Sequence, residues 1–207
     1  MQTVEGGLRE QHKARRRIRI LDATRELLRE SPESVITAER IAERAEVSPA
    51  TVYNLIGPRG KIWEALADGF MDELERLLVP LGTGDPREVV RSTVGLFASD
   101  PVVSRRMVRE WEESGLVLAR SPLTQLRQAM AEAQTQGILR TDINTDALAV
   151  VVGTSCVGAL HQWVAGLIDD ERFLARALFA LDVALAAAAA DPHRDQLLAP
   201  LRTRGTV

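Results

Sequence analysis

The sequence contains one cysteine, Cys156, in 207 residues, so the chain cannot form an internal disulfide. A single thiol is typical of proteins that fold in a reducing compartment. The opening stretch, MQTVEGGLREQHKARRR, also lacks the apolar segment that a secretion signal requires. From these two absences we expect a cytoplasmic protein.

Motifs of the common enzyme classes are missing as well. The histidines His12, His161 and His193 are far apart, and none has the spacing of a His-Glu-x-x-His metal site. The chain has no Gly-rich phosphate loop, no Gly-x-Ser-x-Gly turn and no cysteine beside a catalytic partner. We therefore expect neither an enzyme nor a bound metal or cofactor, although a site assembled only by folding would escape such a scan.

Signals for β-structure are absent too, because no alternating apolar pattern ends at an Asn-Gly or Asp-Gly turn. Apolar residues instead recur at helical spacing. Six of the nine prolines follow Ser or Asp, the order of a helix cap and a first helical residue. These pairs are Ser31-Pro32, Ser48-Pro49, Asp85-Pro86, Asp100-Pro101, Ser121-Pro122 and Asp191-Pro192. The sequence predicts an all-α fold.

Two short helical patterns meet in residues 37–61, which read TAERIAERAEVSPATVYNLIGPRGK. Thr37 is placed to cap the first helix, and Ser48-Pro49 opens the second. The second pattern turns Val52 and Ile56 inward. Its outward residues are Ala50, Thr51, Tyr53 and Asn54. A short helix with such a small and polar outer face, braced by a preceding helix, is typical of a helix-turn-helix that enters the DNA major groove.

Charge is distributed unevenly along the chain. Residues 1–61 carry 12 Lys and Arg against 9 Asp and Glu, a net charge of +3, whereas the remainder carries 14 against 20, a net charge of −6. The basic residues are densest just before the first apolar helix, at Arg9, Lys13, Arg15, Arg16, Arg17 and Arg19. Such a cluster attracts DNA phosphates without reading sequence. For the residues before Lys13, a solvated flexible tail is the alternative.

Two longer helices flank residues 37–61. The first is expected over residues 15–30, with an apolar stripe that packs on this stretch, and a fourth helix is expected over residues 62–80. Further along, residues 147–168 form a run of 22 residues without a formally charged side chain, long enough to span a bilayer. His161 and Gln162 interrupt this run and no basic flank orients it, so we do not expect membrane insertion. With the Ala- and Leu-rich residues 172–190, it instead predicts a four-helix interface between two copies.

Residues 15–70 resemble the DNA-binding region of the TetR family of transcriptional regulators. The resemblance rests on Ile41-Ala42, on Val47-Ser48 and on Thr51 followed two positions later by Tyr53, and it covers about a quarter of the chain. The departures are Glu46 where the family usually has a turn glycine, Ala50 where it often has another, Leu55-Ile56 for a common His-Phe pair, and Arg59 for the phosphate-binding lysine.

The resemblance implies a basic flexible arm (residues 1–14), a helix-turn-helix DNA-binding domain (15–61) and a helical sensor and dimerisation domain (62–207). It also implies a homodimer on a palindromic double-stranded operator, with half-sites roughly 34–36 Å apart. A small apolar or amphipathic ligand would release a repressor of this kind, with residues 62–80 as the lever; activation is left open. The residues it assigns to DNA are Arg17, Thr37, Ser48, Tyr53, Arg59 and Lys61 on phosphate, and Ala50, Thr51 and Asn54 at base edges.

Side chains of the expected sensor domain suggest an apolar ligand pocket. Its candidate walls are Phe97, Met107, Trp111, Met130, His161 and Trp163. Aromatic and Met residues at helical spacing also form ordinary cores, and a buried histidine with satisfied hydrogen bonds is common, so a plain core is the alternative. The alternative function is a helical ligand carrier or enzyme with an N-terminal interaction module.

Overall fold

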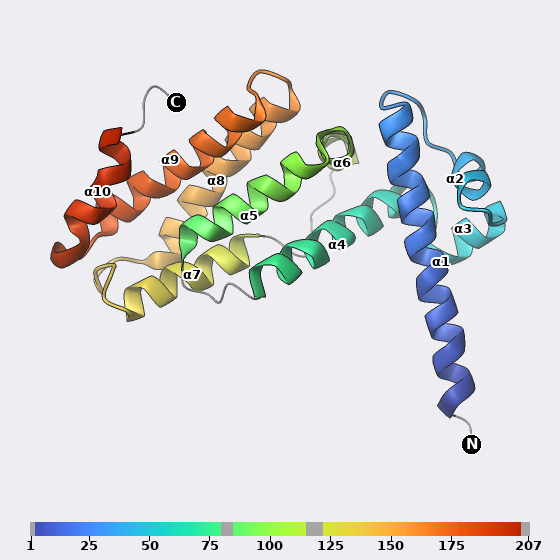
Figure 1. Cartoon of the computed structure of the whole chain (residues 1–207), viewed down its shortest axis with the longest axis horizontal. Helices are drawn as coiled ribbons and strands as arrows, with labels where there is room; N and C mark the ends of the chain where they lie inside the picture. The colour runs from blue at the N-terminus through green and yellow to red at the C-terminus, as the bar shows by residue number, and fades with distance from the viewer. Residues whose placement is uncertain (1–2, 80–84, 115–121, 204–207) are drawn as a thin grey trace. The chain divides into compact units, whose positions relative to one another are not determined.

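A computed structural model describes residues 3–79, 85–114 and 122–203, and Figure 1 shows the arrangement of their helices. Within these ranges the chain forms α-helices, one short 3₁₀ helix and no β-strand, which confirms the all-α fold. The helices are α1 (Thr3–Glu30), α2 (Ala38–Arg44), α3 (Pro49–Leu55), α4 (Arg59–Leu78), α5 (Pro86–Ser99), α6 (Pro101–Ser114), α7 (Leu123–Thr135), α8 (Thr145–Val164), α9 (Asp170–Ala188), η2 (Asp191–His193) and α10 (Arg194–Thr203).

The described residues divide into two compact units. The first unit contains α1, α2, α3, the part of α4 up to Gly69, and α6. The second contains the rest of α4, α5 and α7 to α10. This division differs from the sequence-based boundary, which placed every residue after 61 in one domain, because α6 belongs with the N-terminal helices.

The core of the first unit is built around the apolar stripe of α1. Ile20 and Leu28 of this stripe are fully buried, as are Ile41 of α2 and Val52 of α3. Leu66 of α4 is also buried. Each short helix therefore contributes an inward apolar residue to α1, and burial of this kind, rather than intrinsic helix propensity, stabilises helices of seven residues.

Ion pairs and buried side chains hold α6 against α1. Arg29, in the last turn of α1, lies 2.6 Å from the carboxylate of Asp100, the residue before α6. Arg106 donates to the backbone oxygen of Pro32, which follows α1 in the chain. Met107 and Val108 of α6 are buried. These contacts join residues about 70 positions apart in the sequence, so periodicity alone could not reveal them.

The second unit packs its helices around a chain of aromatic rings. The ring of Phe97 lies 4.4 Å from that of Phe70, centroid to centroid, and 6.5 Å from that of Phe173. Trp163 stacks on Phe173 at 5.4 Å. A buried ion pair crosses the same core, because Arg87 of α5 donates to Asp182 of α9 at 2.7 Å. The fully buried Asp182 carboxylate is thus compensated by a charged donor.

Most helix starts follow the sequence signals. Thr37, Ser48 and Asn144 each cap a helix by accepting a backbone N–H bond, as predicted. Two pairs differ from the prediction. Ser31-Pro32 follows the end of α1 and opens no helix, because the next helix has its own cap at Thr37. Asp191 lies inside the 3₁₀ helix η2 instead of capping it, and the cap position is Ala190. Ser121 lies outside the described residues.

Both ends of the described chain are more helical than the sequence suggested. α1 begins at Thr3, so residues expected to form a flexible arm continue the helix predicted for residues 15–30. Beyond Pro192, where we expected only fraying, α10 runs over Arg194–Thr203 and buries Leu197. The arm has no apolar stripe and the tail has a short one, so apolar periodicity detects neither reliably.

Candidate nucleic-acid interface

The connection between α2 and α3 is a tight turn with a left-handed residue. Glu46 has a φ of +52°, although it is not glycine. Its N–H donates to the carbonyl of Glu43, and the N–H of Val47 donates to the carbonyl of Ala42 at 2.9 Å. This pair of bonds is the Schellman arrangement that commonly ends helices, usually with glycine at the left-handed position. The turn geometry is therefore formed here without the glycine that favours it.

The start of α3 is fixed by Ser48 and Thr51. The Ser48 hydroxyl accepts the N–H of Thr51 at 3.2 Å, and the two hydroxyl oxygens lie 2.9 Å apart. Pro49 occupies the first helical turn, where its missing N–H costs nothing. The two hydroxyls of the helix start consequently lie side by side on the surface, where both can still accept or donate a further bond.

The outer face of α3 is exposed while its inner face is buried. Val52 is fully buried, whereas Ala50 and Asn54 are exposed and 53% of Tyr53 is exposed. Thr51 is half-buried beside the helix start. The residues expected at base edges therefore lie together on one helix, and the ring of Tyr53 lies at the surface.

Arg17 has an internal role that the sequence did not indicate. Its Nη1 donates to the carbonyl oxygen of Leu55, the last residue of α3, at 2.8 Å, and the contact is partly buried. A guanidinium at the carboxyl end of a helix satisfies a free carbonyl and complements the helix dipole. Arg17 therefore ties α1 to the end of α3, and its phosphate contact stays a prediction.

Arg44 fixes α2 on α1 in a similar way. Its guanidinium makes two parallel bonds to the carboxylate of Glu30, at 2.9 and 2.7 Å, and a third to Glu26 at 3.2 Å. The hydrogen bond from Arg44 lowers the pKa of Glu30. Thr37, predicted to contact phosphate, uses its hydroxyl to accept the N–H of Arg40 at 3.3 Å. The sequence did not identify Arg44, because its partners lie 14 and 18 positions away on another helix.

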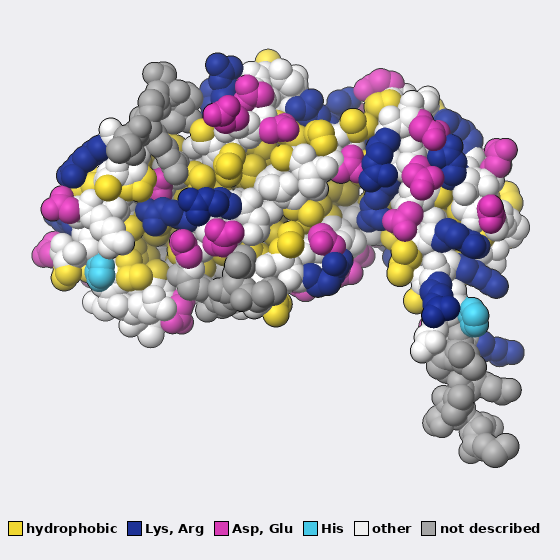
Figure 2. Space-filling model, viewed as in Figure 1, with side chains coloured by type: hydrophobic (Ala, Val, Ile, Leu, Met, Phe, Trp, Pro, Cys, Tyr) yellow, Lys and Arg dark blue, Asp and Glu magenta, His cyan; other side chains and the backbone are white. Residues whose placement is uncertain are grey.

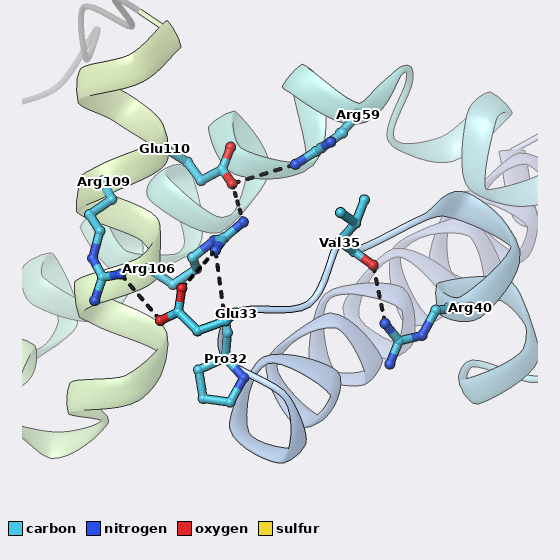
Figure 3. Close-up of polar contacts among 8 residues, drawn as sticks. All are labelled: Pro32, Glu33, Val35, Arg40, Arg59, Arg106, Arg109 and Glu110. Carbon is cyan, nitrogen blue, oxygen red and sulfur yellow. Dashed lines mark hydrogen bonds and ion pairs between the residues drawn. The ribbon is translucent and has the colours of Figure 1, made fainter.

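Arg59 and Lys61, the expected phosphate contacts of α4, are both exposed and both paired. Lys61 lies 2.6 Å from Glu64 on its own helix. Arg59 lies 3.6 Å from Glu110 of α6, and the same carboxylate oxygen lies 2.7 Å from Arg106. Figure 3 shows Arg59 and Arg106 both pointing at the carboxylate of Glu110. The sequence did not indicate Glu110, because its partner Arg59 is on a distant helix.

The cluster around Arg106 extends to one more carboxylate. Glu33 lies 3.3 Å from Arg109 and 3.9 Å from Arg106, as the dashed lines in Figure 3 mark. The side chain of Glu33 is 78% exposed, whereas that of Glu110 is only 13% exposed. Exposed pairs contribute little to stability and half-buried ones more, so Glu110 is the stronger partner for the arginines.

The residues predicted to line a ligand pocket are distributed over both units. Met107 and Trp111 belong to α6 in the first unit, and Phe97, Met130, His161 and Trp163 belong to the second. Met130 and Trp163 are fully buried, and His161 is exposed. The indole N–H of Trp163 donates to Asp170 at 2.6 Å. Phe97 and Trp163 contribute to the aromatic core, so a ligand space beside them stays a prediction.

α8 and α9 pack on each other but leave apolar side chains on the surface. The exposed residues are Val150, Val151 and Val157 of α8, and Phe179 and Val183 of α9. The hydroxyls of Thr154 and Ser155 bond to carbonyls of their own helix, at 2.9 and 3.1 Å. An added Cβ at Gly158 would meet open space. This face is thus apolar or internally satisfied and could be covered without stranding a polar group.

α8 is also the one described helix long and apolar enough to cross a membrane, judged by length and composition alone. Within the described residues, no three His, Cys, Asp or Glu side chains gather into a group that could hold a metal ion. A scan against models of protein families gives no match, and a search of curated proteins gives none either.

Proposed function

We propose that the protein is a DNA-binding transcriptional regulator of the TetR type, in which α2 and α3 form a helix-turn-helix and α3 is the recognition helix. The observation that carries this proposal is the exposed face of α3, where Ala50, Tyr53 and Asn54 project from a helix whose Val52 is fully buried. A helix of seven residues is unstable alone. The cap at Ser48 and the hydrogen bond from Arg17 hold α3 in place, which supports a recognition helix that is already formed before DNA binds.

The proposed contacts follow from the chemistry of the exposed groups. Asn54 presents an amide that can pair with N6 and N7 of adenine, and Ala50 or Thr51 can contact a thymine methyl. Phosphate contacts fall to the hydroxyl and basic groups around this face. These groups are Thr37, Ser48, Tyr53, Arg59 and Lys61.

A palindromic operator requires two copies of α3. The apolar face of α8 and α9, where Val151 and Val157 are exposed, is the surface on which we place the homodimer contact. Two copies related by a two-fold axis would read half-sites roughly 34–36 Å apart. The same interface would cover α8 with protein, so the proposed regulator is cytoplasmic and not inserted in a membrane.

We further propose that a small apolar ligand binding in the second unit releases the DNA. α4 passes from the first unit to the second at Gly69, so it links the two covalently and is the natural lever. Only a ligand that binds the DNA-incompetent arrangement more tightly can shift the equilibrium, by about 1–3 kcal/mol in typical cases. Phe97, Met130 and Trp163, which are buried in that unit, are the residues we propose to line the ligand site.

The experiment that tests this function is the selection of bound sites from random duplexes by the full chain. We expect an enriched palindrome, and an affinity for it that falls steeply with salt as counterions are released. A dissociation constant that does not change with salt, or the absence of any enriched site, would reject DNA regulation as the function.

On the selected operator, we predict that Asn54→Ala relaxes base preference at one position by about 1–3 kcal/mol, because an amide pair with one base is lost. Arg59→Ala should instead weaken all duplexes alike, because phosphate contacts carry no sequence information. Titrations with operator and with random duplex separate the two effects. Equal loss on both duplexes for Asn54→Ala would contradict its assignment.

A further inference from the structure

A groove of about 520 Å³ lies between the N-terminal half of α1 and the outer face of α3. Its lining residues are Arg9, His12, Lys13, Arg16, Thr51, Asn54 and Leu55. In Figure 1 α1 continues well past α2 and α3 toward its N-terminus. Figure 2 shows Lys and Arg side chains gathered along the same part of α1. One wall of the groove is therefore basic, and the other carries the residues proposed to read bases.

The basic wall is one helical stripe. Arg9, His12, Lys13 and Arg16 stand at positions i, i+3, i+4 and i+7, so they share a face of α1. Farther along the helix this face continues into the fully buried Ile20. The face that packs on the other helices thus becomes cationic where α1 runs beyond them.

The basic residues of this wall have no acidic partners among the described residues. Arg25, Arg29 and Arg44 each pair with a carboxylate, at 2.6 to 3.2 Å. Arg9, Lys13 and Arg16, all exposed, make no ion pair or side-chain hydrogen bond within the part of the chain that the structure describes. Unneutralised positive charge facing one concave surface attracts a polyanion.

We propose that this groove holds the sugar-phosphate backbone of the DNA strand whose bases face Thr51 and Asn54, so that α1 and α3 grip one strand from two sides. The inference rests on the proposed DNA-binding function and deepens it. Phosphates of the strand contact Arg9, Lys13 and Arg16, while the amide of Asn54 reaches the base edges. The N-terminal part of α1 is then part of the DNA-binding surface. Its phosphate contacts lengthen the half-site beyond the bases that α3 touches.

This arrangement makes base reading depend on α1. The amide of Asn54 can reach a base edge only if the DNA strand lies deep enough in the groove. The phosphate contacts of Lys13 and Arg16 set how deep the strand lies. Arg15 and Arg19 are also exposed and also positively charged but lie outside the groove lining. They provide a matched control, because their removal changes the net charge of α1 by the same amount.

The test compares the full chain carrying Lys13→Ala and Arg16→Ala with the full chain carrying Arg15→Ala and Arg19→Ala, on the selected operator. Each lost phosphate contact lowers the slope of log affinity against log salt by about 0.9, so the groove variant should lose roughly 2. The control variant should lose clearly less. Thermal unfolding checks that both variants remain folded.

A second readout uses operators that carry one neutral methylphosphonate at successive backbone positions. We expect at least one position where neutralisation weakens the wild-type chain and the control variant several-fold but leaves the groove variant unchanged. If the groove and control variants respond alike at every position, the groove assignment is wrong although the regulator proposal stands. If the wild-type chain itself shows no salt-dependent duplex binding, the proposed function fails first.

Discussion

At the scale of single residues, Glu46 stores strain in the turn before α3. A non-glycine residue at a φ of +52° is disfavoured by about 1–2 kcal/mol, because its Cβ approaches the following carbonyl. We predict that Glu46→Gly raises the free energy of unfolding by roughly 0.5–1 kcal/mol, after the entropy that glycine gains in the unfolded chain is subtracted. Urea denaturation of both proteins measures the difference.

The matched control for this substitution is Glu43→Gly. Glu43 is an exposed glutamate three positions earlier, inside the right-handed α2. There glycine brings no relief and should cost about 1 kcal/mol. The strain argument fails if the two glycine variants change stability in the same direction.

Cys156 gives a pH dependence with a defined sign. Burial raises the pKa of its thiol to about 11. The unfolded chain therefore loses this proton at lower pH than the folded chain does, and stability falls between roughly pH 9 and pH 11. At pH 10 we predict a loss of about 1 kcal/mol relative to pH 8 from this residue.

Other groups also titrate in that range, so the measurement compares the wild-type protein with Cys156→Ala. The difference between their unfolding free energies should shrink or reverse as the pH rises from 8 to 10. The native thiol should also react with iodoacetamide at pH 8 much more slowly than it does in denaturant. Equal rates in the two conditions would show that the thiol is not protected by burial.

At the scale of helices, local signals predicted much of the structure. The caps Thr37, Ser48 and Asn144 were identified correctly, because each depends on a few neighbouring residues. The outward position of Asn54 also followed from the 3.6-residue period. The place of α6 did not follow, because it depends on pairs such as Arg29 with Asp100, which only folding brings together. The sequence indicated the basic residues beside α1 but not the groove, because the residues before 15 were expected to form a flexible arm and their helical continuation has no apolar period.

Glu110 of α6 forms an ion pair with Arg59. Its carboxylate therefore competes with the DNA phosphate that Arg59 is proposed to bind. We predict that Glu110→Gln frees Arg59 and raises affinity for operator and random duplex alike by roughly two- to fivefold. That range corresponds to about 0.4–1 kcal/mol, which lies within the usual range of an exposed ion pair, since half of the Arg59 side chain is exposed. Fluorescence anisotropy titrations measure the change.

Glu33→Gln is the control for this prediction. Glu33 belongs to the same cluster but pairs with Arg106 and Arg109 rather than with Arg59. Its neutralisation alters the long-range field by one charge without releasing Arg59. If the two variants bind equally well, or if Glu110→Gln still raises affinity in an Arg59→Ala background, competition for Arg59 is not the cause.

At the scale of the whole molecule, the proposed regulator depends on the apolar face of α8 and α9. Val157 of α8 is 50% exposed on that face. A carboxylate there would lose its hydration if two copies met, at a cost of several kcal/mol. We predict that Val157→Asp converts the dimer to a monomer, as measured by sedimentation at micromolar concentration.

The monomer should keep the first unit folded and should still bind a single half-site weakly. It should lose the additional affinity that a palindrome gives to two linked recognition helices. Val35→Asp is the matched control, because Val35 is 58% exposed between α1 and α2, away from α8 and α9 in the sequence. It should leave the dimer intact. If the Val157→Asp chain still sediments as a dimer, the dimer interface lies elsewhere. If the wild-type chain is a monomer and still binds the full palindrome tightly, the proposed homodimer is wrong, because a palindromic operator gives additional affinity only to two coupled copies.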